Sequence, residues 1–399
     1  MNNTKISFLI PSLSTGGIAR VMVNLANHFA QNGHNIDLVY CKKKLDLYQS
    51  ISKGVNVFKL KKSNFLYSNI FTIRNDYHNI KYWIKPIIFK NKKEKLICFL
   101  PSLIQYLKNM NPQYIISAQT YTNIITLLAK NHLNSKVKVI LTEHTHLSHE
   151  ILNQNDSYYW KFITPLIQRH YDKADSIVTV SKGVAKDLTE SIGIKPKKIV
   201  TIYNPVIKND IFTKIHEPVV HPWFQGRNLV ILGVGRLEPQ KDWLTLLKAF
   251  VLVLESHPAK LVILGEGSLR KELEQTLSDL DIKGHVEFPG KVKNPYKYMA
   301  RSDVFVLSSL FEGLSNVLIE ALACGCNIVS TDCLSGPAEV LKNGKYGILV
   351  PIHDKYAMSN AILTSLSTFY DQKDLINRAL DFRIENSYHE YNGLIQSLS

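Results

Sequence analysis

The feature that most constrains the fold is an alternation of short apolar runs with longer amphipathic runs, which occurs in both halves of the chain. Short apolar runs predict buried strands, and a period of about 3.6 residues predicts helices that bury one face. In the first half we expect strands at 5–10, 35–40, 113–118, 137–142 and 176–180, and helices at 17–31, 96–109, 121–132, 157–173 and 182–192. Repeated strand–helix units predict an α/β fold with a doubly wound parallel sheet.

The alternation stops at residues 199–227, which contain Asn204-Pro205, Pro218 and Pro222 and few helix signals, and then starts again. In the second half we expect strands at 228–234, 260–264, 285–288, 303–307, 327–331 and 347–350, and helices near 242–256, 267–280, 294–300, 316–324, 336–341 and from 354 onward. A chain of 399 residues is too long for one typical core, so two domains are expected.

We therefore predict two doubly wound, Rossmann-like domains that face one another across a cleft. The expected divisions are an N-terminal domain at 1–204, a linker at 205–227 and a C-terminal domain at 228–380. A helix at 381–399 follows, and packing back onto the first domain is one arrangement open to it. Ligands of open parallel sheets bind beyond the carboxyl ends of the strands, so the loops after the strands should hold the chemistry.

One such loop, residues 311–321, combines a turn, a helix start and two glutamates. Ser and Asn are strong N-caps, so we expect a helix to begin near Ser315 or Asn316. A helix N-terminus suits a phosphate, and Glu312 and Glu320 could accept hydrogen bonds from sugar hydroxyls. On one helix the two carboxylates would stand about 12 Å apart, beyond the roughly 5–9.5 Å of hydrolytic pairs. The stretch predicts a nucleotide-sugar pocket, with ordinary surface glutamates as the alternative.

Two cations follow the first strand of the second half. Arg236 and Lys241 precede the expected helix cap Asp242, and a forked donor beside a point charge suits a diphosphate. Solvated surface cations are the alternative interpretation. The next strand ends in Gly265-Glu266-Gly267-Ser268, where Ser268 could cap a helix and the flexible backbone could receive a base or a ribose.

The first half has weaker signals. Gly16-Gly17 follows a strand and opens a helix, which suits close approach of an anion but also an ordinary tight turn. Its spacing matches neither the dinucleotide-binding fingerprint nor a Walker loop. His144 follows another strand, where it could hydrogen-bond a substrate or be a buried structural histidine. Together with His146 and His149 it lacks a carboxylate or thiolate partner at a standard spacing, so we expect no metal.

Positive charge is concentrated in the first half. Residues 1–204 have a net charge of +17 and the rest of the chain −2, and residues 42–95 alone hold 14 basic and 3 acidic residues. This segment interleaves lysines with aromatic and aliphatic side chains, which is typical of a surface that lies on anionic lipid. A solvated lysine-rich face is the equal alternative. No nucleic-acid-binding motif accompanies the charge, so we expect no nucleic-acid partner.

The remaining composition is that of an ordinary globular protein, with 45% hydrophobic and 20% charged residues. No apolar run reaches the length that spans a bilayer, and residues 6–11 form an expected strand rather than an export signal. The five cysteines make no disulfide framework and are expected to be small buried hydrophobes. These features predict a cytoplasmic protein.

Taken in order, these loops resemble the retaining glycosyltransferases of the large family four, which adopt the GT-B architecture. The matching motifs are Gly16-Gly17-Ile18-Ala19-Arg20-Val21, Tyr203-Asn204-Pro205-Val206, Gly235-Arg236-Leu237-Glu238-Pro239-Gln240-Lys241-Asp242, Gly265-Glu266-Gly267, Phe288-Pro289-Gly290, Glu312-Gly313-Leu314, Glu320-Ala321-Leu322-Ala323-Cys324-Gly325 and Gly336-Pro337-Ala338-Glu339. The resemblance covers nearly the whole chain and is most specific from residue 230 to 351. Residues 42–110 do not contribute to it.

The resemblance implies roles for the matching residues. Its catalytic set would be Arg236, Lys241, Glu312 and His144. The two cations would hold the donor diphosphate, Glu312 would hold hydroxyls of the transferred sugar, and His144 would face that sugar. The donor-binding set would be Gly16, Gly17, Glu266, Val292, Gly313, Leu314, Ser315, Asn316 and Glu320. Within it the second glycine of the pair would donate a backbone N–H to the diphosphate, and Glu320 would bind the ribose.

Two departures from the family pattern bear on specificity. Leu314-Ser315 stands where many relatives have Phe and a small residue, so the resemblance does not specify which sugar the donor carries. Glu143-His144-Thr145 replaces the commoner His-Asp, which leaves the role of the histidine open.

The resemblance further implies an activity. It is transfer of a hexose or N-acetylhexosamine from a nucleotide sugar of the UDP type to a glycan, with retention at the anomeric carbon and without a metal or cofactor. With the basic first domain, it implies a lipid-linked or oligosaccharide acceptor in surface-polysaccharide biosynthesis, such as lipopolysaccharide or capsule. The expected location is peripheral, on the inner face of the cytoplasmic membrane. A nucleotide-sugar epimerase and a non-catalytic sugar-nucleotide-binding subunit remain the alternatives.

Overall fold

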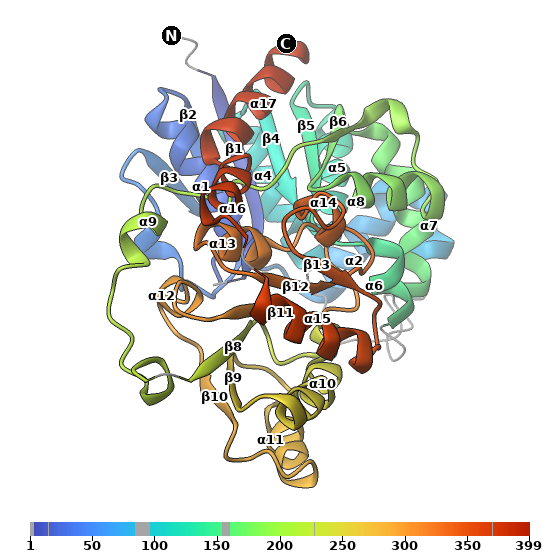
Figure 1. Ribbon diagram of the computed structural model, residues 1–399. Coiled ribbons are helices and arrows are strands. Elements are labelled where there is room, and N and C mark those ends of the chain that lie inside the picture. The colour runs from blue at the N-terminus through green and yellow to red at the C-terminus, as the bar shows by residue number, and fades with distance from the viewer. Residues whose placement is uncertain (1–3, 15, 84–95, 154–159, 227, 369) are drawn as a thin grey trace. The chain divides into compact units, whose positions relative to one another are not determined.

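A computed structural model describes residues 4–14, 16–83, 96–153, 160–226, 228–368 and 370–399 (Figure 1). The chain forms two compact units, which are described separately below. The first unit comprises Met1–Pro205 and Ile384–Ser399, and the second comprises Val206–Arg383.

The first unit is built on a seven-stranded sheet in the order β3-β2-β1-β4-β5-β6-β7. Every neighbouring pair is parallel. The strands are β1 (Lys5–Ser12), β2 (Asn35–Lys42), β3 (Val55–Lys59), β4 (Tyr114–Ala118), β5 (Lys138–Glu143), β6 (Ser176–Thr179) and β7 (Ile199–Thr201). The chain winds outward from β1 in one direction and then resumes on its other side at β4, so the strand order reverses between β1 and β4.

Helices flank this sheet. They are α1 (Gly17–Gln31), α2 (Phe65–Asn75), α4 (Leu100–Met110), α5 (Thr120–Leu133), α6 (Leu147–Asn153), α7 (Trp160–His170), α8 (Lys182–Lys186) and α17 (Ile384–Ser397). Asn111 and Asn134 end α4 and α5 in the left-handed conformation, with φ of 42° and 47°, which asparagine tolerates better than most residues.

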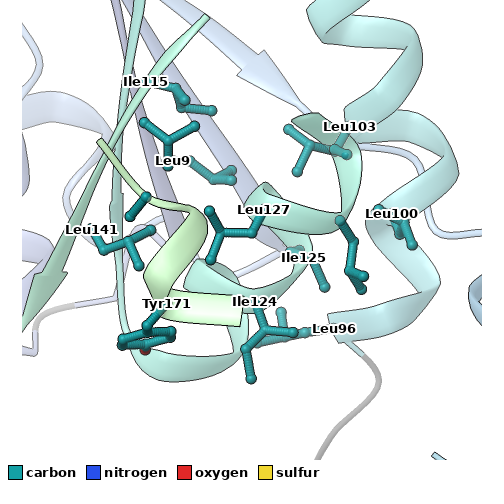
Figure 2. Close-up of a cluster of buried hydrophobic side chains, with 14 of the residues drawn as sticks. Leu9, Leu96, Leu100, Leu103, Ile115, Ile124, Ile125, Leu127, Leu141 and Tyr171 are labelled. Carbon is teal, nitrogen blue, oxygen red and sulfur yellow. The ribbon is translucent and has the colours of Figure 1, made fainter. Parts of the chain in front are cut away.

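The two faces of the sheet carry two separate cores, because successive strand side chains point to opposite faces. Leu9 and Ile115 belong to one core, whereas their neighbours Phe8 and Ile116 belong to the other. Figure 2 shows the first core, where strand side chains meet residues of α4 and α5; its labelled members are Leu9, Leu96, Leu100, Leu103, Ile115, Ile124, Ile125, Leu127, Leu141 and Tyr171. This packing holds the carboxyl ends of the strands in place.

The C-terminal helix α17 belongs to the first unit and packs on α1 (Figure 1). The ring of Tyr388 lies 4.7 Å from that of Phe29 at 68° between planes. Tyr388, Tyr391 and Ile395 are buried in the same core as the apolar side of α1. The last residues of the chain therefore complete the core that its first residues begin.

The second unit has a six-stranded sheet in the order β10-β9-β8-β11-β12-β13, again parallel in every pair. Its strands are β8 (Leu229–Val234), β9 (Ala259–Leu264), β10 (Val286–Gly290), β11 (Val304–Leu307), β12 (Ile328–Thr331) and β13 (Ile348–Val350). Its helices are α9 (Ile211–Lys214), α10 (Trp243–Ser256), α11 (Arg270–Asp279), α12 (Tyr296–Met299), α13 (Asn316–Ala323), α14 (Pro337–Val340), α15 (Lys355–Ser367) and α16 (Gln372–Leu380). The strand order reverses between β8 and β11.

The predicted α/β class with doubly wound parallel sheets is confirmed in both units. Several local features differ from expectation, among them helices α2 and α6, which were not expected. The edge strands β3 and β7 were not expected, the helix expected at 182–192 ends at Lys186 in a π-helical turn over Asp187–Ser191, and the expected linker lies in the second unit from Val206 on. There the Val206 and Ile207 N–H groups both donate to Phe382 O. Residues 157–159 of the expected helix at 157–173 lie outside the described residues.

Candidate functional site

The candidate site of the second unit lies at the carboxyl edge of its sheet, where the strand order reverses. Arg236 and Lys241 follow β8, and Glu312 follows the adjacent strand β11. In open parallel sheets, ligands bind in the crevice at the carboxyl ends of the two adjacent strands between which the strand order reverses. The fold thus brings together residues that are far apart in the sequence.

The centre of this site is an ion pair between Lys241 and Glu312. Lys241 Nζ lies 2.5 Å from Glu312 Oε1, and their side chains are only 12% and 10% exposed. The same oxygen accepts a hydrogen bond from Ser309 Oγ at 2.7 Å. An ion pair with so little solvent is worth little to stability, but removing one partner leaves an uncompensated buried charge. Its geometric effect is to hold a cation and a carboxylate side by side.

Arg236 is held by its own loop. Its NH2 atom donates to Gln240 Oε1 at 3.1 Å, and its carbonyl accepts from Trp243 Nε1 at 2.9 Å. Gln240 Nε2 in turn donates to Phe311 O at 2.8 Å, which ties the loop after β8 to the loop after β11. The indole of Trp243 is part of the core of this unit. These contacts fix the loop that carries the Arg236 guanidinium.

Helix α13 begins at Asn316, within the predicted interval. Ser315 precedes it in the left-handed conformation, with φ of 65°. Ser315 occupies the N-cap position, but its hydroxyl makes no cap bond and is a buried oxygen without a partner among the described residues. The turn is instead held by close packing against Gly336, where an added Cβ would lie 2.8 Å from the carbonyl carbon of Leu314.

Glu320 lies on α13, whereas Glu312 lies before it. Glu320 is buried and accepts a hydrogen bond from Tyr296 Oη at 3.3 Å. The two carboxylates therefore have different partners, Lys241 and Ser309 for one and Tyr296 for the other. This supports separate binding roles rather than a paired acid and base.

Glu266 and Val292 follow β9 and β10, the next strands out from β8. Glu266 Oε1 lies 3.3 Å from Arg270 NH1 and would be 2.7 Å from a Cβ at Gly290, so its carboxylate stands over the end of β10. The prediction that Ser268 caps a helix is wrong, because α11 begins at Arg270 and Ser268 Oγ donates to Glu238 Oε2. The Leu269 N–H donates to Leu237 O at 2.9 Å, and a Cβ at Gly267 would lie 2.3 Å from the same oxygen, so packing against the loop after β8 holds this segment outside the helix.

The candidate residues of the first unit follow β1 and β5. Gly17 opens α1, and Gly16 precedes it at φ of −66°. A Cβ at Gly16 would meet only Ser14 Oγ, at 3.8 Å, and both glycines are exposed. The chain's own packing therefore does not demand a glycine at position 16. This bare backbone lies beside β1, where the order of this sheet reverses.

His144 is a neutral imidazole in a defined orientation. Thr142 Oγ1 donates to Ser117 O at 3.0 Å, so it accepts from His144 Nε2, which lies 2.9 Å away. The ring proton is thus on Nε2, and Nδ1 is a buried acceptor with no partner in the described part of the chain. Burial lowers the pKa of His144 to about 4. The residue can accept a hydrogen bond near neutral pH but carries no charge there.

Sequence reasoning missed a buried acid beside this histidine. Glu143 accepts hydrogen bonds from Tyr171 Oη, from Asn123 Nδ2 at 2.8 Å and from Thr120 Oγ1 at 3.4 Å. Burial raises the pKa of Glu143 to about 7, and the hydrogen bonds only partly offset this. The signal was present as a carboxylate at the end of an apolar strand, but the sequence did not show its burial. Gln119, before Thr120, has a φ of 77°.

Among the described residues no group of three or more His, Cys, Asp or Glu side chains could hold a metal ion. The five cysteines are all buried and free, and burial raises the pKa values of Cys41, Cys326 and Cys333 to about 12. In the described ranges, no helix has both the length and the apolar character needed to cross a bilayer.

Two doubly wound parallel sheets of this kind define an α/β protein of the GT-B fold. The lipopolysaccharide outer core galactosyltransferase WaaB in its apo form superposes with a TM-score of 0.72 at 21% identity, over 99% of each chain. Anabaena HepE in complex with UDP-glucose superposes with a TM-score of 0.75 at 18% identity, over 98% of this chain and 99% of HepE.

The family follows from the sequence. The model of glycosyl transferases group 1 matches residues 219–381, and that of glycosyltransferase family 4 matches residues 15–209. The chain belongs to family four of the glycosyltransferases.

Two relatives come from Campylobacter jejuni. The N-acetylgalactosamine-N,N'-diacetylbacillosaminyl-diphospho-undecaprenol 4-alpha-N-acetylgalactosaminyltransferase is 36% identical over 258 residues, which cover 64% of this chain and 68% of that protein. The GalNAc-alpha-(1->4)-GalNAc-alpha-(1->3)-diNAcBac-PP-undecaprenol alpha-1,4-N-acetyl-D-galactosaminyltransferase is 27% identical over 401 residues, 98% of each chain.

Proposed function

We propose that this protein transfers a hexose or N-acetylhexosamine from a UDP-sugar to a lipid-linked glycan, with retention at the anomeric carbon. The reaction would serve surface-polysaccharide biosynthesis at the inner face of the cytoplasmic membrane. The observation that carries the proposal is the Lys241–Glu312 pair at the point where the strand order of the second sheet reverses. In this proposal Lys241 supplies a cation to the diphosphate and Glu312 supplies a carboxylate to sugar hydroxyls.

The two cations would stabilise the leaving diphosphate. Negative charge builds on it as the glycosyl–phosphate bond breaks, and Arg236, Lys241 and the start of α13 present positive potential that is already oriented. We propose that this replaces a metal ion. In a same-face attack, the acceptor oxygen bonds to the anomeric carbon, the phosphate oxygen departs, and that phosphate takes the proton of the acceptor hydroxyl. No protein base is then needed.

Carboxylates and backbone would position the donor. Glu312, already held on one oxygen by Lys241 and Ser309, would take sugar hydroxyls, and Glu320 would take the ribose. Glu266 and Val292, with residues 313–316, would line the rest of the donor site in the second unit. In the first unit we assign Gly16 and Gly17 to the diphosphate and the Nδ1 acceptor of His144 to a sugar hydroxyl.

The acceptor assignment is supported by the Campylobacter relatives, whose names specify undecaprenol-linked glycans. The positive charge of the first unit supports a membrane location. A lipid-linked acceptor lies in a membrane, and an enzyme that acts on it must approach an anionic surface. The donor nucleotide is supported by the GT-B neighbour solved with UDP-glucose.

The decisive experiment has two parts. Calorimetry with UDP and GDP, and with their sugars, tests for the donor site, and we expect a UDP species to bind. Transfer of radiolabelled sugar from a donor panel to membrane lipid extract, with and without extract, tests the reaction. Consumption of donor without acceptor would instead indicate an epimerase, and binding without consumption would indicate a non-catalytic subunit. Absence of affinity for every UDP and GDP species would overturn the proposal.

A further inference from the structure

Helix α2 (Figure 1) has its polar side buried and its apolar side exposed. Ser68, Asn69 and Thr72 are at most 4% exposed. The opposite face and the turns that follow it expose five large apolar side chains by 40–68%: Leu66, Tyr67, Ile70, Tyr77 and Ile80. We call this set the apolar face. An exposed apolar group of this kind on a helix that buries its polar side points to an interaction surface.

The inversion is fixed by hydrogen bonds rather than by weak packing. Ser68 Oγ donates to Asn64 O at 2.8 Å, and Thr72 Oγ1 donates to Ser68 O at 2.8 Å, so the buried hydroxyls are satisfied. At the end of the helix the buried carboxylate of Asp76 is a hub. It lies 2.9 Å from His170 Nε2 and accepts from Trp83 Nε1 at 2.7 Å and from Asn79 Nδ2 at 2.8 Å.

This hub ties the segment to α7, which carries His170. Burial by itself would raise the pKa of Asp76, but the bonds from His170, Trp83 and Asn79 outweigh it and lower that pKa. The anchored polar side prevents α2 from rotating to hide its apolar side chains. The hydrogen bonds of the polar side therefore keep the apolar face exposed in the first unit.

The exposed charges of the segment that carries the apolar face all have one sign. Between residues 59 and 83 the exposed charged side chains are Lys59, Lys61, Lys62, Arg74 and Lys81. The single acidic residue of that stretch is Asp76, which is buried in the hub. Arg74 lies one and two turns from Ile70 and Leu66 on the same side of α2. Cations beside aliphatic and aromatic side chains match the interface of an anionic bilayer.

We propose that the apolar face inserts into the interfacial layer of an anionic membrane, with the five cations against its head groups. This deepens the proposed function, on which it rests for a membrane-linked acceptor, by naming the element that makes the contact. A second copy of the chain is disfavoured as the occupant, because a two-fold contact would bring identical positive surfaces together. The membrane supplies both the apolar layer and the negative charge.

The test is flotation of the full chain with vesicles of phosphatidylcholine alone or with about 30% phosphatidylglycerol, at low and high salt. We expect binding to the anionic vesicles only, weakened by salt. The double variant Leu66→Ser/Ile70→Ser should bind at least about tenfold more weakly. Its control is Val220→Ser/Tyr356→Ser, which changes two apolar side chains elsewhere that are at least as exposed and should bind like the wild type.

A second pair of variants tests the charges. Lys61→Gln/Lys62→Gln/Arg74→Gln should lose most anionic binding, whereas Lys108→Gln/Lys136→Gln/Lys197→Gln, three exposed lysines on other segments of the first unit, should keep it. Equal loss in both triple variants, unchanged flotation of the serine variant, or no flotation of the wild type would overturn the proposal. A dimer that the serine variant dissociates, with unchanged flotation, would assign the face to self-association instead.

Calorimetry with UDP on the same proteins separates this proposal from the proposed function. The face variants should bind UDP like the wild type, because they lie outside the donor residues. Wild-type protein that floats but binds no nucleotide would overturn the proposed function alone. Wild-type protein that binds UDP but does not float would overturn the membrane proposal alone.

Discussion

At the scale of single residues, Lys241 shows how a site can be positioned by its own counter-charge. Its amine is held beside Glu312, a residue 71 positions away, with both side chains nearly buried. A lysine with free rotation would have to be ordered when a diphosphate binds, at an entropic cost. A lysine already held by a carboxylate avoids most of that cost.

We expect Arg236→Ala or Lys241→Ala to lower turnover at least about a hundredfold, which corresponds to roughly 2.7 kcal/mol of transition-state stabilisation. The reason is that each removes a positive group from the leaving diphosphate. Steady-state kinetics with the identified donor measure the loss, and Lys248→Ala, an exposed lysine on α10, is the matched control. Near-wild-type rates in both alanine variants would exclude this mechanism.

Glu143 should make the stability of the first unit depend on pH. Its pKa of about 7 in the folded protein lies above the ordinary 4.5, so the folded state binds an extra proton between these values. Stability then falls as pH rises from about 4.5 to 7, by about 3 kcal/mol for this group. Glutamine at this position mimics the protonated acid and removes the effect.

The measurement is the urea midpoint of wild type and Glu143→Gln between pH 4.5 and 8. The variant should gain on the wild type as pH rises, and Glu190→Gln, with a side chain that is 66% exposed, should show no such trend. A difference that stays constant with pH would mean that Glu143 is ionised in the folded protein throughout.

At the scale of elements, the start of α13 depends on a neighbouring loop. Gly336 has a φ of 94°, and a Cβ there would collide with the backbone of Leu314. The loop that follows β12 therefore supports the turn before α13. This dependence explains why Ser315 can adopt a left-handed conformation without a side-chain cap.

Gly336→Ala should destabilise the protein by about 1–3 kcal/mol and weaken UDP binding, because the turn at 313–316 must move. Gly393→Ala is the informative control. It lies in α17 with no atom within 4 Å of an added Cβ, so it should be neutral or stabilise by about 0.5–1 kcal/mol. Thermal unfolding and calorimetry measure both. Unchanged nucleotide affinity in Gly336→Ala would show that this turn does not contact the donor.

At the scale of the whole molecule, the chain leaves the first unit after Pro205, forms the second unit and returns at Ile384. The returning helix buries Tyr388 against Phe29, so the core of the first unit needs both ends of the chain. The contacts that complete this core join residues from the two ends of the chain. They therefore have a long sequence separation.

Tyr388→Ala should therefore destabilise the first unit by about 3 kcal/mol or more, since it removes a buried aromatic ring. Tyr356→Ala, whose side chain is exposed, should change stability by less than about 0.5 kcal/mol. Hydrogen exchange resolved by segment shows where the loss falls. Loss of protection confined to 206–383 would contradict the assignment of α17 to the first unit's core.

The sequence alone was enough for the two runs of strand–helix units, the parallel sheets and the order of Arg236, Lys241, Glu312 and Glu320 along the site loops. These follow from short-range periodicity and from the rule that loops after parallel strands share one edge. Strands β3 and β7 were missed because edge strands of five and three residues carry too little periodic signal.

Only the tertiary structure decided which side chains meet and which are buried. The Lys241–Glu312 pair joins loops after two adjacent strands, and the acid of Glu143 is enclosed by Tyr171 and Asn123. Helix α2 turns its apolar side outward, and Asp76 at its end is bound by His170. Local sequence encodes the propensity of a segment, whereas burial and ion pairing depend on which distant segment the topology places against it. The details of the candidate site belong to that second kind of information.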